Sequence, residues 1–200
     1  MGVGKMRNAK IERKTGETAI TVELEIDGSG KREISTGVGF LDHMLDLFAK
    51  HGLFDLNVKC VGDLNIDSHH TIEDVAIVLG QSFAKAIGDK KGIKRYGQRI
   101  LPMDETMCIC AVDYSGRPYL VMDAKFETER VNDFATECVE DFFYSFAINA
   151  GLNLQFKLFN GRNDHHKIEA MFKALARAMR EACEIDPRAS GEIPSTKGVL

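Results

Sequence analysis

The sequence predicts an α+β fold made by internal duplication, in which two sheet-plus-two-helix halves pack their helices together between two outer β-sheets. Three observations support this: a segment near residue 69 recurs near residue 165, its apolar positions have helical spacing, and the preceding stretches alternate as strands do. We expect a single domain over residues 1–200, with a first half of about 1–94, a second half of about 95–186 and a C-terminal tail at 187–200.

The duplication follows from one constant shift along the chain. DSHHTIEDVAIVLGQSFAKAI aligns with NDHHKIEAMFKALARAMREAC, and each aligned pair is 96 residues apart, since 165 minus 69 equals 96. The apolar positions are three or four residues apart, as on one face of an amphipathic helix. They pair as Ile72 with Ile168, Val75 with Met171, Ala76 with Phe172, Leu79 with Leu175, and Phe83 with Met179.

Upstream segments extend the repeat. FLDHMLDLFAKHGLFDLNVKC is similar to VEDFFYSFAINAGLNLQFKL, so each half is expected to contain helix, glycine, strand, turn and helix in that order. ETAITVELEIDGSGKREISTG alternates in polarity and predicts a hairpin around DGSG, and MCICAVDYSGRPYLVMDAKF predicts another around SGRP. Each half therefore has its own small sheet.

Composition excludes several classes of protein. The 44% hydrophobic and 28% charged fractions are ordinary for a globular chain, and no run of eighteen apolar residues is present. The opening MGVGKMRNAK lacks the features of a secretory signal, so we expect a cytoplasmic protein with no membrane partner. A net charge of −4 argues against nucleic-acid binding. The five cysteines lie in apolar settings and are interpreted as reduced core residues.

Four of the six histidines lie in two octets, DSHHTIED and NDHHKIEA, and their spacing indicates metal binding. Residues four apart share a helix face, whereas the adjacent histidine is rotated by about 100° and faces a different partner. Pseudo-symmetry then predicts two mirrored sites, one formed by His69, Glu73 and His166 and the other by His165, Glu169 and His70.

A structural alternative explains part of each octet, because Asp67 and Asn163 are good helix caps and i,i+4 pairs are common on helix surfaces. Two matched copies favour metal over this alternative. His43 and Asp141, 98 residues apart, are candidates for a fourth ligand on each ion. Mixed nitrogen and oxygen donors suit manganese, ferrous iron or zinc and do not suit calcium. His51 is either a substrate contact or a helix-end cation.

A longer set of motifs covers nearly the whole chain in a fixed order: GVGFLDHML, GDLNIDSHHTIEDVAIVLGQ, RYG, PMDET, DYSGRPYL, NDHHKIEAMFKALARAM and PSTKGV. Together they resemble the imidazoleglycerol-phosphate dehydratase family of histidine biosynthesis. The resemblance implies a manganese-dependent hydro-lyase with two Mn²⁺ per active site, acting on a small phosphate ester. It also implies self-association into 24 subunits, with active sites where subunits meet.

The resemblance assigns metal ligands that agree with the helical geometry. It groups His43, His70, His165 and Glu169 around one manganese, and His69, Glu73, Asp141 and His166 around the other. Many members of the family carry histidine at the position of Asp141. Because aspartate is shorter and anionic, Asp141 binds directly, through a water, or not at all.

The resemblance also assigns contacts to the substrate. Its catalytic set is Glu17, His43, His70, Glu73, His165 and Glu169, and its further substrate contacts are His51, His69, Arg95, Arg117, Lys173, Ser195, Thr196 and Lys197. The arginines and Lys197 suit a phosphate monoester, although SGRP at Arg117 is also a good turn. Glu17 is the implied proton-abstracting base, with Asp104 and Glu105 as alternatives.

Two other functions fit the doubled motif. A non-catalytic scaffold would use metal only to join subunits and would not need the cations. A dinuclear metallohydrolase would use metal-bound water and would release phosphate or cleave an amide instead of forming a ketone.

Overall fold

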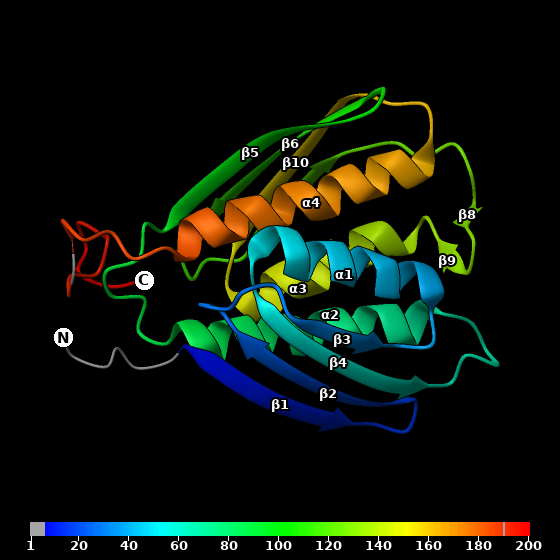
Figure 1. Cartoon of the computed structure of the whole chain (residues 1–200), viewed down its shortest axis with the longest axis horizontal. Coiled ribbons are helices and arrows are strands. Elements are labelled where there is room, and N and C mark those ends of the chain that lie inside the picture. The colour runs from blue at the N-terminus through cyan, green and yellow to red at the C-terminus, as the bar shows by residue number, and fades with distance from the viewer. Residues whose placement is uncertain (1–6, 190) are drawn as a thin grey trace.

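The computed structural model describes residues 7–189 and 191–200, so most of the opening segment on which the expectation about a leader rests lies outside the described residues. Two four-stranded sheets form the outer layers, and four long helices lie between them (Figure 1). This arrangement confirms the predicted α+β fold with an internal duplication. Within the described ranges, no helix is both long and apolar enough to cross a bilayer.

The two halves have the same order of elements, except that the second half has two additional short strands, β8 and β9, before α3. The first contains β1 (Asn8–Lys14), β2 (Thr18–Glu25), β3 (Arg32–Ser35), α1 (Gly39–Gly52), β4 (Asp55–Gly62) and α2 (His69–Ile87). The second contains β5 (Tyr96–Met103), β6 (Thr106–Asp113), β7 (Tyr119–Asp123), the short β8 (Arg130–Val131) and β9 (Phe134–Ala135), α3 (Cys138–Ala150), β10 (Asn153–Asn160) and α4 (Asp164–Cys183). Their sheets have matching strand orders, β1-β2-β4-β3 and β5-β6-β10-β7.

The predicted hairpins around DGSG and SGRP are wrong. β2 and β3 flank β4 instead of pairing with each other, and β6 and β7 flank β10 in the same way. β3 runs parallel to β4, because α1 connects them as a crossover, and α3 with its preceding segment connects β7 to β10. The hairpins that do form are β1–β2 and β5–β6, and each places its turn beside the start of a helix bearing a histidine doublet.

The helices of the two halves interlock at the centre. α1 packs against α4 and α2 packs against α3, so each helix pair joins one half to the other. Phe48 of α1, Phe83 of α2 and Phe146 of α3 are buried and pack edge to face. Because each pair unites different halves, any site between paired helices takes residues from both copies of the repeat.

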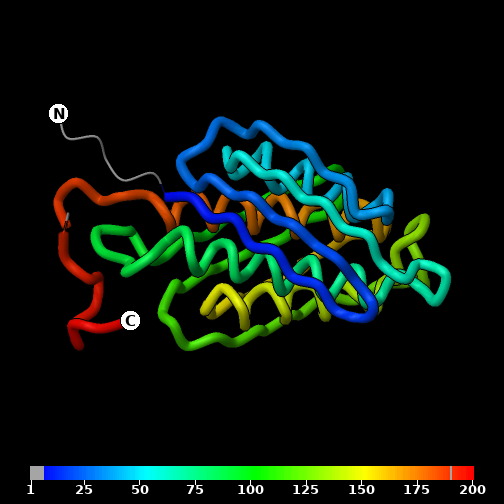
Figure 2. Tube along the Cα trace, turned by 90° about the horizontal axis from the view of Figure 1, so that it is seen from below, coloured from blue at the N-terminus to red at the C-terminus, as the bar shows by residue number. Residues whose placement is uncertain are grey.

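Both doublets lie at helix starts, as the octets predict. The Asp67 side chain accepts the backbone N–H of His69 at 2.8 Å, and the Asn163 side chain accepts that of His165 at 2.9 Å. Each satisfies one of the free N–H groups at its helix start. The described part of the C-terminal tail lies at the opposite end of the molecule from these starts, as both views show (Figures 1 and 2).

Candidate metal centre

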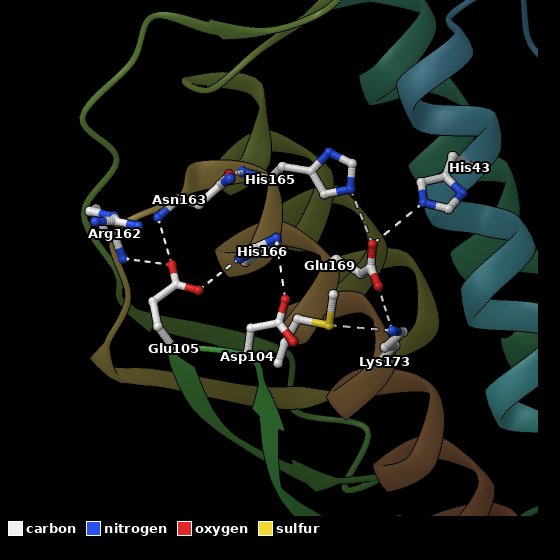
Figure 3. Close-up of polar contacts among 10 residues, drawn as sticks. His43, Asp104, Glu105, Arg162, Asn163, His165, His166, Glu169 and Lys173 are labelled. Atoms are coloured by element: carbon white, nitrogen blue, oxygen red, sulfur yellow. Dashed lines mark hydrogen bonds and ion pairs between the residues drawn. The ribbon is translucent and has the colours of Figure 1, made fainter.

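The first cluster lies between α1 and the start of α4. His165 Nε2 lies 3.1 Å from Glu169 Oε2, and His43 Nε2 lies 3.4 Å from the same oxygen (Figure 3). The three donor atoms lie within 4.8 Å of one another. We call this group the α4 cluster. Three donors converging on one point are the arrangement that a metal ion requires.

The carboxylate of the α4 cluster is held from both sides. Glu169 is only 6% exposed, and Lys173, one turn further along α4, donates a hydrogen bond to its Oε1. Burial acts to raise the pKa of Glu169, but the hydrogen bond and charge of Lys173, together with His165, outweigh burial and lower the pKa. Glu169 is therefore ionised and held in place by Lys173.

The second cluster lies between α2 and the start of α3. His69 Nδ1 lies 3.8 Å from Asp141 Oδ2, and His69 Nε2 lies 3.9 Å from Glu73 Oε2. We call His69, Glu73 and Asp141 the α2 cluster. Because the two carboxylates approach opposite nitrogens of one ring, His69 must rotate before all three donors can share an ion. The side chains of His69, Glu73 and Asp141 are all more than two-fifths exposed.

A thiol that sequence reasoning placed only in the core adjoins the α2 cluster. Cys138 is buried, as expected for all five cysteines, but its Sγ lies 3.7 Å from His69 Nδ1. Burial raises the pKa of Cys138 to about 11. Cys138 precedes Asp141 by three residues, and this helical spacing was the signal that could have revealed the contact.

The second histidine of each doublet points away from the first. The ring centroids of His69 and His70 are 6.1 Å apart with their planes at 81°, and those of His165 and His166 are 6.1 Å apart at 80°. Neither His70 nor His166 therefore reaches the cluster beside it, and no group of three donors in the described part of the chain includes either one.

His70 and His166 instead face the hairpin turns. His70 Nδ1 lies 3.0 Å from Asp63 Oδ2, and this hydrogen bond raises the pKa of His70 despite opposing desolvation. His70 Nε2 lies 3.7 Å from Glu17 Oε1 in the β1–β2 turn. His166 Nδ1 lies 2.8 Å from Glu105 Oε2 in the β5–β6 turn (Figure 3). Asp63 is the partner that sequence reasoning missed, because no repeat or spacing singles it out.

The other candidate substrate contacts near the clusters lie on α1 and α4. His51, in the last turn of α1, has its pKa lowered mainly by burial and further by the nearby charges of Lys173 and Arg177. Lys173 also lies 3.6 Å from the sulfur of Met103. Lys173 thus lies between the α4 cluster, through its bond to Glu169, and His51, whose pKa its charge lowers.

The cations implied for phosphate binding lie elsewhere. Arg95 forms two hydrogen bonds to Asp113, at 2.7 and 3.2 Å, and a third to the Pro194 carbonyl oxygen at 2.8 Å. A Cβ on Gly116, next to Arg117, would lie 3.0 Å from the carbonyl carbon of Leu200, so the tail ends beside that turn.

Ser195, Thr196 and Lys197 belong to the same tail, where Lys197 N–H is bonded to Ser195 Oγ at 3.2 Å. The backbone N–H of Arg95 donates a hydrogen bond to the carbonyl oxygen of Ala182, near the end of α4. His165 lies at the start of the same helix. His165 and Ala182 are seventeen positions apart in the sequence, which corresponds to about 25 Å along the helix. One chain therefore does not bring its phosphate candidates to its metal candidates.

Comparison with known proteins agrees with the motifs. The family profile described as imidazoleglycerol-phosphate dehydratase matches residues 36–179. Imidazoleglycerol-phosphate dehydratase of Acetivibrio thermocellus is 58% identical over 97% of this chain and 99% of its own length, and that of Methylorubrum extorquens is 54% identical over 98% and 100%.

Solved structures agree as well. The crystal structure of imidazoleglycerol-phosphate dehydratase from Staphylococcus aureus has a TM-score of 0.82 at 42% identity, covering 90% of this chain and 99% of that one. That of the Pyrococcus furiosus protein has a TM-score of 0.83 at 35% identity, covering 95% and 100%. On profile, sequence and structure alike, the chain belongs to the imidazoleglycerol-phosphate dehydratase family.

Proposed function

We propose that this hydro-lyase is metal-dependent and converts imidazole glycerol phosphate to imidazole acetol phosphate and water in histidine biosynthesis. The observation that carries the metal dependence is the convergence of His43, His165 and Glu169 within 4.8 Å. A second group around His69, formed with Cys138 and Asp141, meets the same limit. Nitrogen and oxygen donors of this kind suit Mn²⁺, of which we propose two per active site.

Each ion would take ligands from more than one copy of the chain. One set is His43, Glu169 and His165 with His70, and the other is His69, Glu73 and Asp141 with His166. His70 and His166 do not reach a cluster within their own chain, but both present Nε2 toward the surface turns, where a neighbouring copy can approach.

The distribution of substrate contacts also supports self-association. Phosphate candidates and metal candidates lie at opposite ends of α4, so a complete site requires the tail end of one chain beside the helix starts of another. Exposed apolar side chains on the second sheet offer a surface for such contacts: Tyr96, Ile100, Tyr119, Val121 and Phe159. We propose closed assembly into 24 copies.

The residues divide the chemistry among them. When bound, the cations would lower the pKa of the substrate's imidazole ring, so that the ring can expel the hydroxyl from the adjacent carbon. Glu17 is exposed and lies 3.7 Å from His70 Nε2, so its carboxylate is beside a proposed ligand and can accept the proton from the next carbon. The resulting enol becomes the ketone.

Binding of the phosphate falls to the tail end of the chain. Arg95 is fixed by Asp113 and by the Pro194 carbonyl, so it offers a preorganised guanidinium edge next to Ser195 and Lys197. Arg117 lies in the turn beside the end of the tail. A planar guanidinium and a mobile ammonium together match a phosphate monoester. The cytoplasmic location and the division of the domain at residues 94/95 and 186/187 stay predictions.

The decisive assay follows ketone formation from imidazole glycerol phosphate by the full chain loaded with Mn²⁺. We expect turnover that a chelator abolishes and Mn²⁺ restores. Arg117→Gln should lose turnover while the assembly persists, and Lys59→Gln, on the exposed face of β4 and paired with Glu33, is the control for loss of a surface cation. If the wild-type protein assembles but shows no turnover, the scaffold function is favoured. If it releases phosphate from the substrate, the hydrolase function is favoured.

A further inference from the structure

The second histidine of each doublet is held by a carboxylate at the same ring atom. Asp63 Oδ2 lies 3.0 Å from His70 Nδ1, and Glu105 Oε2 lies 2.8 Å from His166 Nδ1 (Figure 3 shows the second pair). Neither carboxylate belongs to the helix that carries the histidine. The two pairs therefore depend on tertiary structure and not on helical spacing.

Duplication alone does not explain this agreement. Asp63 directly follows β4, and the residue that directly follows the equivalent strand β10 is Gly161. Glu105 directly precedes β6, and the residue that directly precedes the equivalent strand β2 is Glu17. Positions that do not correspond in the repeat thus make the same contact. What the two halves share is a histidine whose Nδ1 is held by a carboxylate, and each half supplies that carboxylate from a different position.

The contact determines which nitrogen can bind a metal. An ionised carboxylate only accepts hydrogen bonds, so Nδ1 of a neutral His70 or His166 carries the proton and Nε2 keeps its lone pair. His70 Nε2 lies 3.7 Å from Glu17 Oε1, and His166 Nε2 lies 3.7 Å from Asp104 Oδ2. Both distances are too long for a hydrogen bond, so each lone pair faces an acidic group without being occupied by it.

We propose that Asp63 and Glu105 are positioning residues, which fix His70 and His166 as Nδ1–H tautomers and present Nε2 to cations held by neighbouring copies of the chain. This inference rests on the proposed function, because it takes both histidines as metal ligands. Carboxylates that orient metal-binding histidines in this way raise the basicity of the ligand, and their loss weakens metal binding by about 10- to 100-fold.

The two carboxylates are held unequally. Glu105 Oε1 accepts the backbone N–H groups of Arg162 at 3.0 Å and Asn163 at 2.8 Å, so both of its oxygens have fixed partners. Asp63 Oδ1 is buried and has no hydrogen-bond partner among residues 7–189 and 191–200. Glu105 is therefore anchored to the segment before α4, whereas the side chain of Asp63 has His70 as its hydrogen-bond partner.

This difference predicts unequal effects of amide substitution. In Glu105→Gln the amide oxygen is kept in place by two N–H donors, so the NH₂ group must face His166 Nδ1 and force the proton onto Nε2. The lone pair needed by the metal is then lost. In Asp63→Asn no donor competes for the oxygen, which can stay on His70 Nδ1 and keep the original tautomer. Asp63→Ala removes the acceptor altogether.

The test is Mn²⁺ binding by the full-length assembly, followed by the electron paramagnetic resonance signal of free Mn²⁺, with thermal unfolding measured in parallel. Glu105→Gln should weaken one of two classes of bound Mn²⁺ by about 10- to 100-fold, and Asp63→Ala should weaken the other class by a similar factor. Asp63→Asn should change binding by less than either. Glu23→Gln, on the exposed face of β2 and paired with Lys10, is the matched control for loss of a carboxylate.

The outcomes separate this inference from the proposed function. If wild-type protein binds no Mn²⁺, the metal dependence itself is wrong. The positioning role is overturned if the wild-type protein binds two classes of Mn²⁺ and the folded variants Glu105→Gln and Asp63→Ala bind both classes as tightly as the wild type does. Should Glu105→Gln fail to fold, Asp63→Ala decides, because no other hydrogen bond of that side chain is present in the described part of the chain.

Discussion

The α4 cluster is closed, in the sense that its donor atoms converge around a buried carboxylate. The α2 cluster is open, in the sense that its donor atoms lie further apart and its carboxylates are exposed. His43 and His165 both approach one oxygen of Glu169, which is 6% exposed and has Lys173 on its other oxygen. In the α2 cluster, Glu73 is 3.9 Å from His69 and more than two-fifths exposed. Both octets supply the same histidine and glutamate donors, so the difference arises from other positions.

Two substitutions between the repeats account for the difference. The position equivalent to Lys173 is Ile77, so α2 carries no ammonium one turn beyond Glu73. The position equivalent to His43 is Asp141, which offers a shorter side chain. A duplicated motif thus places two donor clusters symmetrically, but the neighbouring side chains decide how closely the donor atoms of each cluster approach one another.

The largest expected effect is on turnover, and it compares two variants in which either Glu169 or Glu73 is replaced by glutamine. Glu169→Gln should lower kcat/KM by about 1,000-fold, because it removes a preoriented anion that two histidines share. Glu73→Gln should lower it by about 10- to 100-fold, because Glu73 is not preoriented. Steady-state kinetics at saturating Mn²⁺ measure both. Equal losses in the two variants would break the distinction between closed and open clusters.

The next largest effect concerns stability at the helix starts. Asp164, at the start of α4, accepts hydrogen bonds from Lys167 and from the backbone N–H groups of Glu127 and Thr128. Asp164 and Lys167 form an ion pair, and both side chains are buried. The equivalent residue on α2 is Ser68, whose side chain makes no capping bond. Asp164→Asn should lower the free energy of unfolding by about 3 kcal/mol, because it leaves the Lys167 charge buried without an anion.

Ser68→Ala is the matched control and should cost less than about 1 kcal/mol. Urea denaturation of both variants measures the difference. Adding Lys167→Met to Asp164→Asn should recover part of the lost stability, since the unpaired charge is then gone. Similar losses in Asp164→Asn and Ser68→Ala would show that the two helix starts are supported alike.

Sequence reasoning found the repeat, the four helices and the outer sheets, because a 96-residue shift and helical spacing are visible in one dimension. It misplaced the hairpins, because the alternation of ETAITVEL and REIS identifies strands without identifying their neighbours. Insertion of β4 between them depends on the α1 crossover, which local turn signals such as DGSG do not encode.

The candidate site was predictable only in part. The spacing of His165 and Glu169, and of His69 and Glu73, follows from helix geometry. The contact of Asp63 with His70 could not be predicted, because it depends on where the chain leaves β4 and on no motif. Separation of Arg95 and Lys197 from the clusters also required the structure, since it depends on which end of α4 each approaches.

The smallest expected effect is acid sensitivity, and it contrasts Asp55 at the start of β4 with its counterpart Asn153 at the start of β10. Burial acts to raise the pKa of Asp55, but hydrogen bonds from the backbone of Ser29 and Lys31 outweigh it and lower the pKa. The stabilisation is therefore complete above the ordinary aspartate pKa and is lost as pH falls through the lower, folded-state value.

Asp55→Asn should make the free energy of unfolding less dependent on pH below about pH 4, the ordinary range for an aspartate. Asn153→Ala should leave the pH dependence of unfolding as in the wild type. Thermal melts at successive pH values from neutral to acid check both. A parallel shift of the Asp55→Asn and wild-type curves at every pH would contradict the role of ionised Asp55.

Anomalous scattering from crystals of the Mn²⁺-loaded protein tests the central claim most directly. The account predicts two manganese peaks for each chain, one beside His43, His165 and Glu169 and one beside His69 and Glu73, each also contacted by the second histidine of a doublet from a neighbouring copy. A single peak per chain, or peaks away from all four doublet histidines, would contradict it.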